Sequence, residues 1–248
     1  MTLHITECAD LPVAQRRKRT KSFEFEFSRC SYSVQLRAGL GPCAKIKNKT
    51  LLKNICASVS SGHVLTIMGP SGAGKTTLLN VLTCEDAGGK PVGDVTLNSN
   101  PLSAKTYEQH CAYVRQTDSL WPFMTAREHI TMAVTFYARA DQQVSEEVNQ
   151  LIKSLGLGSC QNTRVGGSTM SKGGLSGGQK RRLSLAMAMA KNPSILFLDE
   201  PTSGLDAAAA ASIMHFLTVF AAKKNVAVLC TIHQREQAPR TIDPLGPF

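Results

Sequence analysis

One short stretch of the chain has the residue types and the spacing needed to bind phosphate. It satisfies the pattern G-x-x-x-x-G-K-[ST] and lies between an apolar run at 64–68 and an amphipathic stretch at 78–82, which is the strand-loop-helix setting that the pattern requires. Its glycines let the backbone turn N–H groups toward an anion, and the N-terminus of the following helix adds a positive field. The predicted phosphate loop consists of Gly69, Pro70, Ser71, Gly72, Ala73, Gly74, Lys75, Thr76 and Thr77.

Two side chains of this loop predict what it binds. In loops of this pattern the lysine, here Lys75, reaches the β- and γ-phosphates of a nucleotide, and the threonine hydroxyl, here Thr76, ligates Mg²⁺. A glycine-rich turn before a core helix is the alternative, but it does not explain why strand, lysine and threonine occur together. The loop therefore predicts a nucleotide site that uses Mg²⁺.

The composition is that of a globular protein with a basic excess. The 248 residues are 42% hydrophobic and carry a formal net charge of +10, which allows one α/β domain or at most two small ones. A basic run at 16–21 predicts a solvated tail or, alternatively, a patch for nucleic acid or anionic lipid. The eight cysteines form no C-x-x-C pair, which favours reduced thiols over a zinc site. No stretch is long and apolar enough to span a bilayer, so we expect no transmembrane segment.

Apolar periodicity predicts strands and helices on both sides of the phosphate loop. Continuous apolar runs at 195–198 and 226–232 predict strands covered on both faces of a parallel sheet. Thr125 and Glu128 have the spacing of a capping box, and Asp206 can cap a further helix. The other expected strands lie at 23–27, 32–36, 51–59, 64–68, 94–97 and 111–115. The expected helices lie at 78–82, 125–137, 144–155, 176–191 and 207–220. We also expect a loop at 38–49 and a disordered basic tail at 1–22.

Four further elements follow the phosphate loop in a fixed order. Gln116 ends a strand, Leu175-Ser176-Gly177-Gly178-Gln179 opens a helix, Asp199-Glu200 ends an apolar strand, and His233 ends the last strand. Each of these alone has a structural explanation. Together and in this order they closely resemble the nucleotide-binding domain of ATP-binding-cassette (ABC) proteins.

Within that superfamily the chain resembles the G subfamily, the white-type half-transporters, from about Phe25 to Gln234. The resemblance implies an α/β fold of the P-loop NTPase (RecA-like) type, with a parallel-sheet core, an N-terminal antiparallel β subdomain and an inserted α-helical subdomain at about 117–190. The residues that carry it are Tyr113-Val114-Arg115-Gln116, Met124-Thr125-Ala126-Arg127-Glu128, Val165-Gly166-Gly167, Ser176-Gly177-Gly178-Gln179-Lys180-Arg181-Arg182 and Thr231-Ile232-His233-Gln234.

The resemblance implies Mg²⁺-dependent hydrolysis of ATP and assigns roles to particular residues. Attack on the γ-phosphate needs positioning and neutralised charge, so Lys75, Thr76 and a Mg²⁺ held partly by Asp199 are expected to carry most of it. Glu200, at the polar end of an apolar strand, is the candidate general base. By resemblance, His233 orients the γ-phosphate and Glu200, and Gln116 senses Mg²⁺ and the attacking water.

Other residues are implied to contact the nucleotide. The helix start formed by Ser176, Gly177, Gly178 and Gln179 closes in this family over the ATP of a second protomer, so that two chains bind two nucleotides head to tail and Asp206 links the halves. Tyr32 stands where the family often places an aromatic ring against the adenine. A strand tyrosine packed into the core is the alternative for Tyr32.

The resemblance also implies partners outside the nucleotide site. Residues 120–123 (Leu-Trp-Pro-Phe) stand where ABC domains meet their membrane domain, and they could instead form subdomain core. We expect a second nucleotide-binding domain and the transmembrane domain of a half-transporter as partners, no specific nucleic acid, and a place on the cytoplasmic side of a membrane. The residues that determine the exported substrate are expected to lie in membrane helices that this sequence does not contain.

The end of the chain departs from the family pattern. Residues 235–248 contain three prolines and no strand periodicity, where the family has further strands. A splice form, a fragment, a gene-model error and a genuine short product all fit this departure. We expect it to leave the strand at 226–232 as an uncovered edge. Three functions therefore stay open: an ATPase cassette that powers export of a lipid-like or hydrophobic substrate, an ATP-binding interaction protein that pairs with half-transporters without turnover, and a soluble non-transport ABC ATPase.

Overall fold

The first sheet of the protein is mainly parallel and carries the candidate site at one end. The computed structural model describes residues 4–8, 22–38, 45–83, 89–117, 119–138, 143–166 and 173–233. Five strands form this sheet in the order β1-β4-β9-β8-β7, in which β1 alone is antiparallel to its neighbour. The strands are β1 (His4–Cys8), β4 (Val64–Met68), β7 (Cys111–Val114), β8 (Ile195–Leu198) and β9 (Ala227–Ile232).

The second sheet is antiparallel and has the order β3-β2-β5-β6. Its strands are β2 (Glu24–Ala38), β3 (Lys45–Ser60), β5 (Lys90–Leu97) and β6 (Asn100–Pro101). The short strands predicted at 23–27 and 32–36 are one long strand with shifts of register between Phe27 and Ser33. The loop predicted over 38–49 is shorter than expected, because β3 begins at Lys45 and pairs with β2 from there. This pairing satisfies backbone N–H and C=O groups of residues 45–49.

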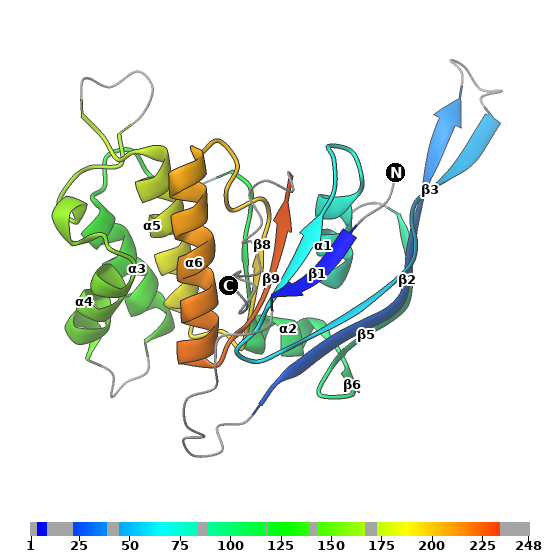
Figure 1. The fold of residues 1–248 in the computed structure, drawn as a ribbon, viewed down its shortest axis with the longest axis horizontal. Coiled ribbons are helices and arrows are strands. Elements are labelled where there is room, and N and C mark those ends of the chain that lie inside the picture. Colours follow the sequence, from blue (N-terminus) through cyan, green and yellow to red (C-terminus); the bar gives the residue numbers. More distant parts are fainter. Residues whose placement is uncertain are drawn as a thin grey trace, which may run out of the picture.

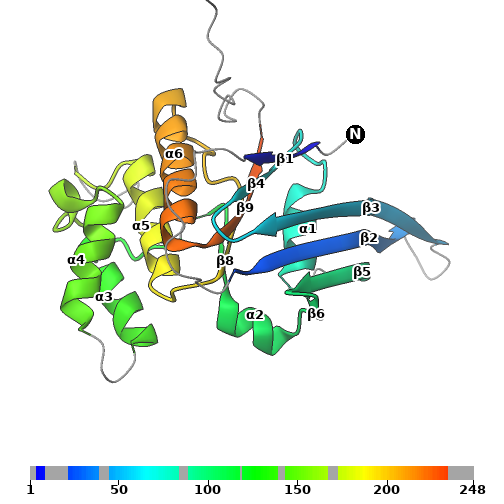
Figure 2. The same cartoon turned by 60° about the horizontal axis from the view of Figure 1, so that its bottom comes forward.

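The helices lie mostly on one side of the parallel strands, with the antiparallel sheet on the other (Figure 1, Figure 2). They are α1 (Lys75–Leu82), α2 (Ala104–His110), α3 (Ala126–Tyr137), α4 (Val144–Ser154), the 3-10 turn η1 (Gly158–Cys160), α5 (Gly177–Met189) and α6 (Ala207–Lys224). Sequence periodicity did not reveal α2. Ser103 caps it, and it contains no buried residue that could produce an apolar stripe.

The predicted helix caps are present. Thr125 and Glu128 form the expected capping box at the start of α3, and the side chain of Asp206 accepts the N–H of Ala209 at 2.8 Å. Hydrogen bonds from the backbone N–H and then the hydroxyl of Thr125 lower the pKa of the Glu128 carboxyl. Ser176 and Gln179 form a second capping box at the start of α5.

Successive residues of each inner parallel strand face two different cores. On β8, Leu196 and Leu198 pack in the core formed with α5 and α6, whereas Ile195 and Phe197 pack in the core formed with α1 and the antiparallel sheet. Side chains alternate across a strand, so a strand covered on both faces is apolar at every position. This arrangement confirms the α/β fold and the buried strands that the continuous apolar runs predicted.

The place of β9 corrects one expectation. The sequence predicted an uncovered edge at 226–232, but β9 lies between β4 and β8. The edge strand on this side is β1, which pairs with β4 from His4 opposite Met68 to Cys8 opposite Val64. The argument for a binding-only protein relied on a frayed last strand. Because β9 is paired on both sides, the structure does not support that argument.

The strand β1 corrects a second expectation, because residues 4–8 were predicted to belong to a disordered tail. An open sheet edge presents unpaired N–H and C=O groups, and the β-branched types of Ile5 and Thr6 favour an extended backbone beside it. Most of the remaining tail, up to residue 21, and the segment 234–248 lie outside the described residues.

Deleting residues 1–8 is expected to expose the backbone groups of β4 that face β1. Peptides covering 64–68 should then take up deuterium faster, whereas peptides covering 195–198, in the interior of the same sheet, should exchange as before. Hydrogen–deuterium exchange with mass spectrometry measures both. Unchanged uptake at 64–68 would contradict the pairing of β1 with β4.

Candidate nucleotide site

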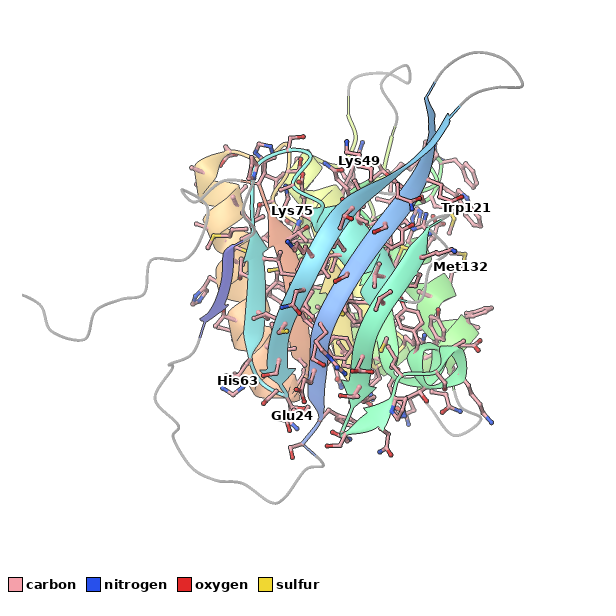
Figure 3. The ribbon with its side chains drawn as sticks, turned by 90° about the vertical axis from the view of Figure 1, so that its right-hand side faces the viewer. Glu24, Lys49, His63, Lys75, Trp121 and Met132 are labelled. Atoms are coloured by element: carbon pink, nitrogen blue, oxygen red, sulfur yellow. The ribbon has the colours of Figure 1, made fainter. Side chains whose placement is uncertain are left out.

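The candidate site lies at the carboxyl ends of the parallel strands. The phosphate loop follows β4, Gln116 follows β7, Asp199 and Glu200 follow β8, and His233 follows β9. Figure 3 shows Lys75 toward the end of the molecule opposite Glu24 and His63. Open parallel sheets bind ligands at this end. A cavity of about 660 Å³ occupies it, and its lining residues are Leu51, Ser71, Gly72, Gly74, Lys75, Thr76, Thr77, Gln116, Glu200, Ser203 and His233.

The backbone of the phosphate loop has the shape that an anion site needs. Gly72 and Gly74 have φ values of 74° and 93°, which are left-handed conformations that favour glycine. A Cβ on Gly74 would lie 2.9 Å from the Leu52 side chain. The first hydrogen bond of α1 runs from Leu78 N–H to Gly74 C=O, so the N–H groups of the preceding residues have no partner within the helix and lie at the cavity wall.

Lys75 is buried, and its ammonium group holds the loop and the opposite strand together. Its exposed fraction is 5%. Nζ donates to the carbonyl oxygens of Gly69 at 2.9 Å and Pro70 at 3.1 Å, and it lies 3.2 Å from Oε1 of Glu200. The lysine and the candidate base, which are far apart in sequence, therefore meet in the cavity.

Hydrogen bonds hold both the side-chain carboxylate and the backbone N–H of Glu200. Its Oε2 accepts a hydrogen bond from Nε2 of Gln116 at 2.9 Å, and its backbone N–H donates to Oγ1 of Thr231 at 2.8 Å. Its φ is 45°, a left-handed conformation that costs roughly 1–3 kcal/mol for a non-glycine residue unless its surroundings enforce it. Such backbone strain is typical of functional sites.

Asp199 and Thr231 form a buried pair behind Glu200. Thr231 is 0% exposed and Asp199 is 2% exposed, and the Thr231 hydroxyl donates to Oδ1 of Asp199 at 2.7 Å. Sequence reasoning missed Thr231 as a site residue, although its place on β9, two residues before His233, was a usable signal. Of the three residues predicted to hold Mg²⁺, Thr76 and Gln116 line the cavity, whereas Asp199 is not among its lining residues.

Tyr32 is not among the residues of the cavity wall. It is 3% exposed and packs in the core of the antiparallel sheet with Phe25 and Phe27. This placement agrees with the alternative of a core tyrosine rather than with adenine contact. Leu51 and Ser203 line the cavity instead, and neither belongs to the pattern that identified the site.

The start of α5 lies outside the cavity wall described above. Ser176 accepts the N–H of Gln179 at 3.3 Å and donates its own backbone N–H to the Gln179 side chain at 2.9 Å. A Cβ on Gly177 or Gly178 would meet neighbours at 3.6 and 4.0 Å, which is ordinary contact. Packing within the described chain therefore does not require these glycines. Asp206 is exposed at the start of α6.

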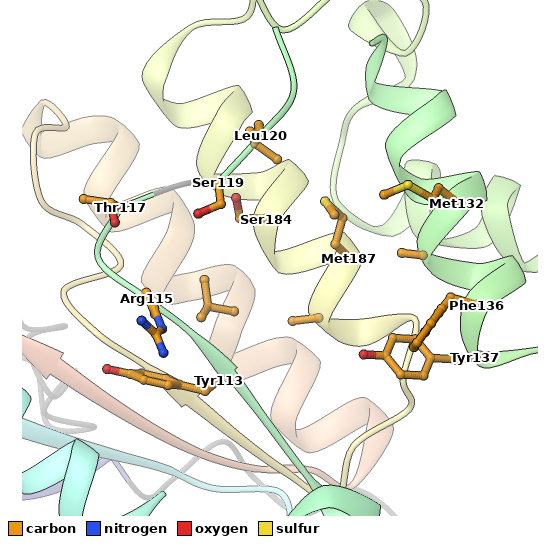
Figure 4. Close-up of a pocket in the computed structure, with 13 residues that line it drawn as sticks. Tyr113, Arg115, Thr117, Ser119, Leu120, Met132, Phe136, Tyr137, Ser184 and Met187 are labelled. Carbon is orange, nitrogen blue, oxygen red and sulfur yellow. The ribbon is translucent and has the colours of Figure 1, made fainter. Parts of the chain in front are cut away.

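A second, largely apolar cavity of about 450 Å³ lies between α3 and α5 (Figure 4). Met132, Phe136 and Met187 are on one side of it, and Arg115 and Ser184 are on the other. The neighbouring residues Trp121 and Phe123 are 50% and 66% exposed, and their rings stack with centroids 6.0 Å apart. Of residues 120–123, Leu120 packs against the core, so the quartet combines a core residue with an exposed aromatic surface.

The sheet order, the loop and the strand-end residues define a P-loop nucleotide-binding fold, and sequence comparisons agree with that class. The family model described as "ABC transporter" matches residues 52–203. ABC transporter G family member 22 of Dictyostelium discoideum is 35% identical over 224 residues, which are 86% of this chain and 34% of the relative. Protein white of Drosophila melanogaster is 42% identical over 192 residues, which are 75% of this chain and 28% of the relative.

The chain therefore belongs to the ABC transporter family and is a white-type, G-family ATP-binding domain. ABC transporter G family member 7 of Arabidopsis thaliana, 40% identical over 190 residues, agrees with that placement. The chain spans about a third or less of the length of these curated relatives.

Replacing Thr231 with Val keeps the shape of the side chain but removes the hydroxyl that joins Asp199 to the Glu200 N–H. We expect the free energy of unfolding to fall by about 1–3 kcal/mol, because buried polar groups lose their partner. Urea denaturation measures this fall.

Thr66 provides the matched control, because it is also buried but its hydroxyl contacts only the sulfur of Cys230, at 3.6 Å. Thr66→Val should cost clearly less, since sulfur is a weak partner. Equal losses in the two variants would show that the Thr231 hydroxyl has no special part in the site.

Proposed function

We propose that this chain binds and hydrolyses ATP with Mg²⁺ as the cassette of a G-family exporter. The observation that carries the proposal is the convergence of Lys75, Gln116, Glu200 and His233 on one cavity beside the phosphate loop. Lys75 begins α1 after the loop that follows β4, and the other three residues follow the parallel strands β7, β8 and β9. Their types supply a cation for phosphate, a carboxylate base and polar groups for positioning.

The contact between Lys75 and Glu200 suggests how nucleotide binding prepares the base. The phosphates of ATP compete with Glu200 for the ammonium group, so Lys75 turns to them and releases Oε1 of Glu200. Gln116 keeps its hold on Oε2. The freed Oε1 can then accept a proton from the attacking water, which is general-base catalysis.

The remaining site residues bind and orient the substrate. The N–H groups at the start of α1 bind phosphate oxygens, and His233, exposed at the end of β9, orients the γ-phosphate. Mg²⁺, held by Thr76 and Asp199 with Gln116 nearby, would neutralise charge on the phosphate oxygens. Thr231 holds Asp199 in place for that role.

We further propose that two such domains pair head to tail. The glycines at the start of α5 leave an open helix N-terminus that faces no phosphate site within the described chain, and packing does not require them. A nucleotide held by a second domain would bind there through Ser176, Gly177, Gly178 and Gln179. Asp206 would link the two halves.

The apolar cavity and the aromatic pair Trp121–Phe123 support a membrane-domain partner. Exposed apolar surface of this kind is typical of a protein interface, and the linker that carries it follows Gln116 directly. None of the helices in the described part of the chain combines the length and the apolarity that a membrane crossing needs. We propose that this face docks on the cytoplasmic side of a membrane domain, which exports a lipid-like or hydrophobic substrate.

Lys75→Ala is expected to weaken ATP binding strongly, because it removes a charge directed at the phosphates. Hydrogen bonds to charged groups contribute about 1.5–3 kcal/mol, so the dissociation constant should rise roughly 10- to 150-fold. Titration calorimetry with Mg²⁺ present measures the change. Lys53→Ala on the exposed face of β3 is the control and should bind as the wild type does. Equal affinity in all three proteins would refute the site.

Glu200→Gln is expected to slow hydrolysis far more than it weakens binding. Glutamine keeps the size and the contact with Gln116, but it cannot take a proton, and such a base contributes about 10²–10⁴-fold. Single-turnover phosphate release gives the rate and calorimetry gives the affinity. Sedimentation of the ATP-loaded variant should show a dimer. A variant that turns over at the wild-type rate would exclude Glu200 as the base.

A further inference from the structure

Arg181 connects the helix start at Ser176 to the two strand ends that carry the candidate catalytic residues. It lies on α5 and is 4% exposed. Its Nη1 donates to the carbonyl oxygen of Arg115 at 2.5 Å, and its Nη2 donates to the carbonyl oxygen of Asp199 at 2.7 Å. One planar guanidinium group therefore bridges the residues that directly follow β7 and β8.

Those two carbonyl groups determine how the next residues are oriented. The peptide group is planar, so the carbonyl of Arg115 fixes the direction of the N–Cα bond of Gln116, and the carbonyl of Asp199 does the same for Glu200. The side chains of Gln116 and Glu200 meet at 2.9 Å. Glu200 also has its left-handed φ of 45°, which a non-glycine residue keeps only when its surroundings hold it there.

Packing alone does not explain a charged group at this position. Leu183 and Leu185 of the same helix are fully buried as apolar side chains, and an apolar side chain in place of Arg181 would avoid the cost of burying a charge. The guanidinium contributes what a leucine cannot, namely two directed donors that reach two strands at once.

We propose that Arg181 is a positioning residue. It keeps the side chains of Gln116 and Glu200 in a fixed orientation relative to each other, and it couples their position to that of the helix start at Ser176. The helix α5 begins one residue after Ser176, so a shift of α5 on contact with a partner's nucleotide moves the guanidinium and both carbonyl groups together. This inference rests on the proposed function, in which Glu200 is the base and the start of α5 contacts the second nucleotide.

The chain offers a matched control for the test. Lys191, just after α5, donates from Nζ to the carbonyl oxygen of Cys111 at 2.8 Å. Lys191→Met removes a cation that binds the carbonyl of Cys111 at the start of β7, whereas Arg181→Met removes one that binds the carbonyl of Arg115 just after the end of β7. Arg181→Lys is the conservative variant, because an ammonium group keeps the charge and loses the planar fork.

Hydrogen–deuterium exchange of the full chain without nucleotide tests the positioning itself. Arg181→Met should raise uptake both in peptides covering 115–117 and in peptides covering 199–203, and Arg181→Lys should do so less. Lys191→Met should leave both regions unchanged. Unchanged uptake in Arg181→Met, or the same increase in Lys191→Met, would overturn the proposal, and neither result depends on ATP binding.

Nucleotide measurements then separate this inference from the proposed function. Arg181→Met should bind ATP within about threefold of the wild type, while single-turnover hydrolysis falls by up to about 10²-fold, as expected when reacting groups are misplaced. Lys191→Met should hydrolyse at the wild-type rate. A wild-type chain that does not bind ATP would refute the proposed function and leave the exchange result to decide on Arg181. Wild-type hydrolysis by Arg181→Met would refute the role of Arg181 alone.

Discussion

The ammonium group of Lys75 is a buried charge, and the architecture of the site follows from the need to compensate it. A charge removed from water is costly unless it is paired and hydrogen-bonded. In this chain the compensation comes from two carbonyl groups of the phosphate loop and from Glu200 at the end of β8. The buried ammonium charge is therefore compensated only where the loop after β4 and the end of β8 lie side by side. Nucleotide phosphates are anions that could replace Glu200 as its partner.

The parallel sheet provides that arrangement. With β9 between β4 and β8, the Thr231 hydroxyl can reach both Asp199 and the N–H of Glu200. The inner strands are buried and mostly apolar, and the polar side chains of the site lie at or just beyond their ends. Gln116 and His233 therefore lie at the cavity, whereas the start of α5 is not part of the cavity wall.

Local signals could be predicted from the sequence, and long-range pairing could not. The phosphate loop and the caps at Thr125, Ser176 and Asp206 depend on residues only a few positions apart, so their patterns are visible in the chain. The order of the strands depends on contacts between distant segments, which is why β1 and the interior position of β9 were missed. Thr231 was missed because its role comes from two hydrogen bonds across strands, and the pattern could not decide between adenine contact and core packing for Tyr32, which the structure places in the core.

A crystal structure of the wild-type chain grown with Mg²⁺ and a non-hydrolysable ATP analogue would show whether nucleotide phosphates replace Glu200 as the partner of Lys75. We expect phosphates in the loop at 69–77, with Nζ of Lys75 bound to phosphate oxygens and no longer paired with Oε1 of Glu200. Gln116 should still contact the Glu200 carboxylate. An analogue bound elsewhere, with the contact between Lys75 and Glu200 intact, would show that the loop at 69–77 is not the nucleotide site.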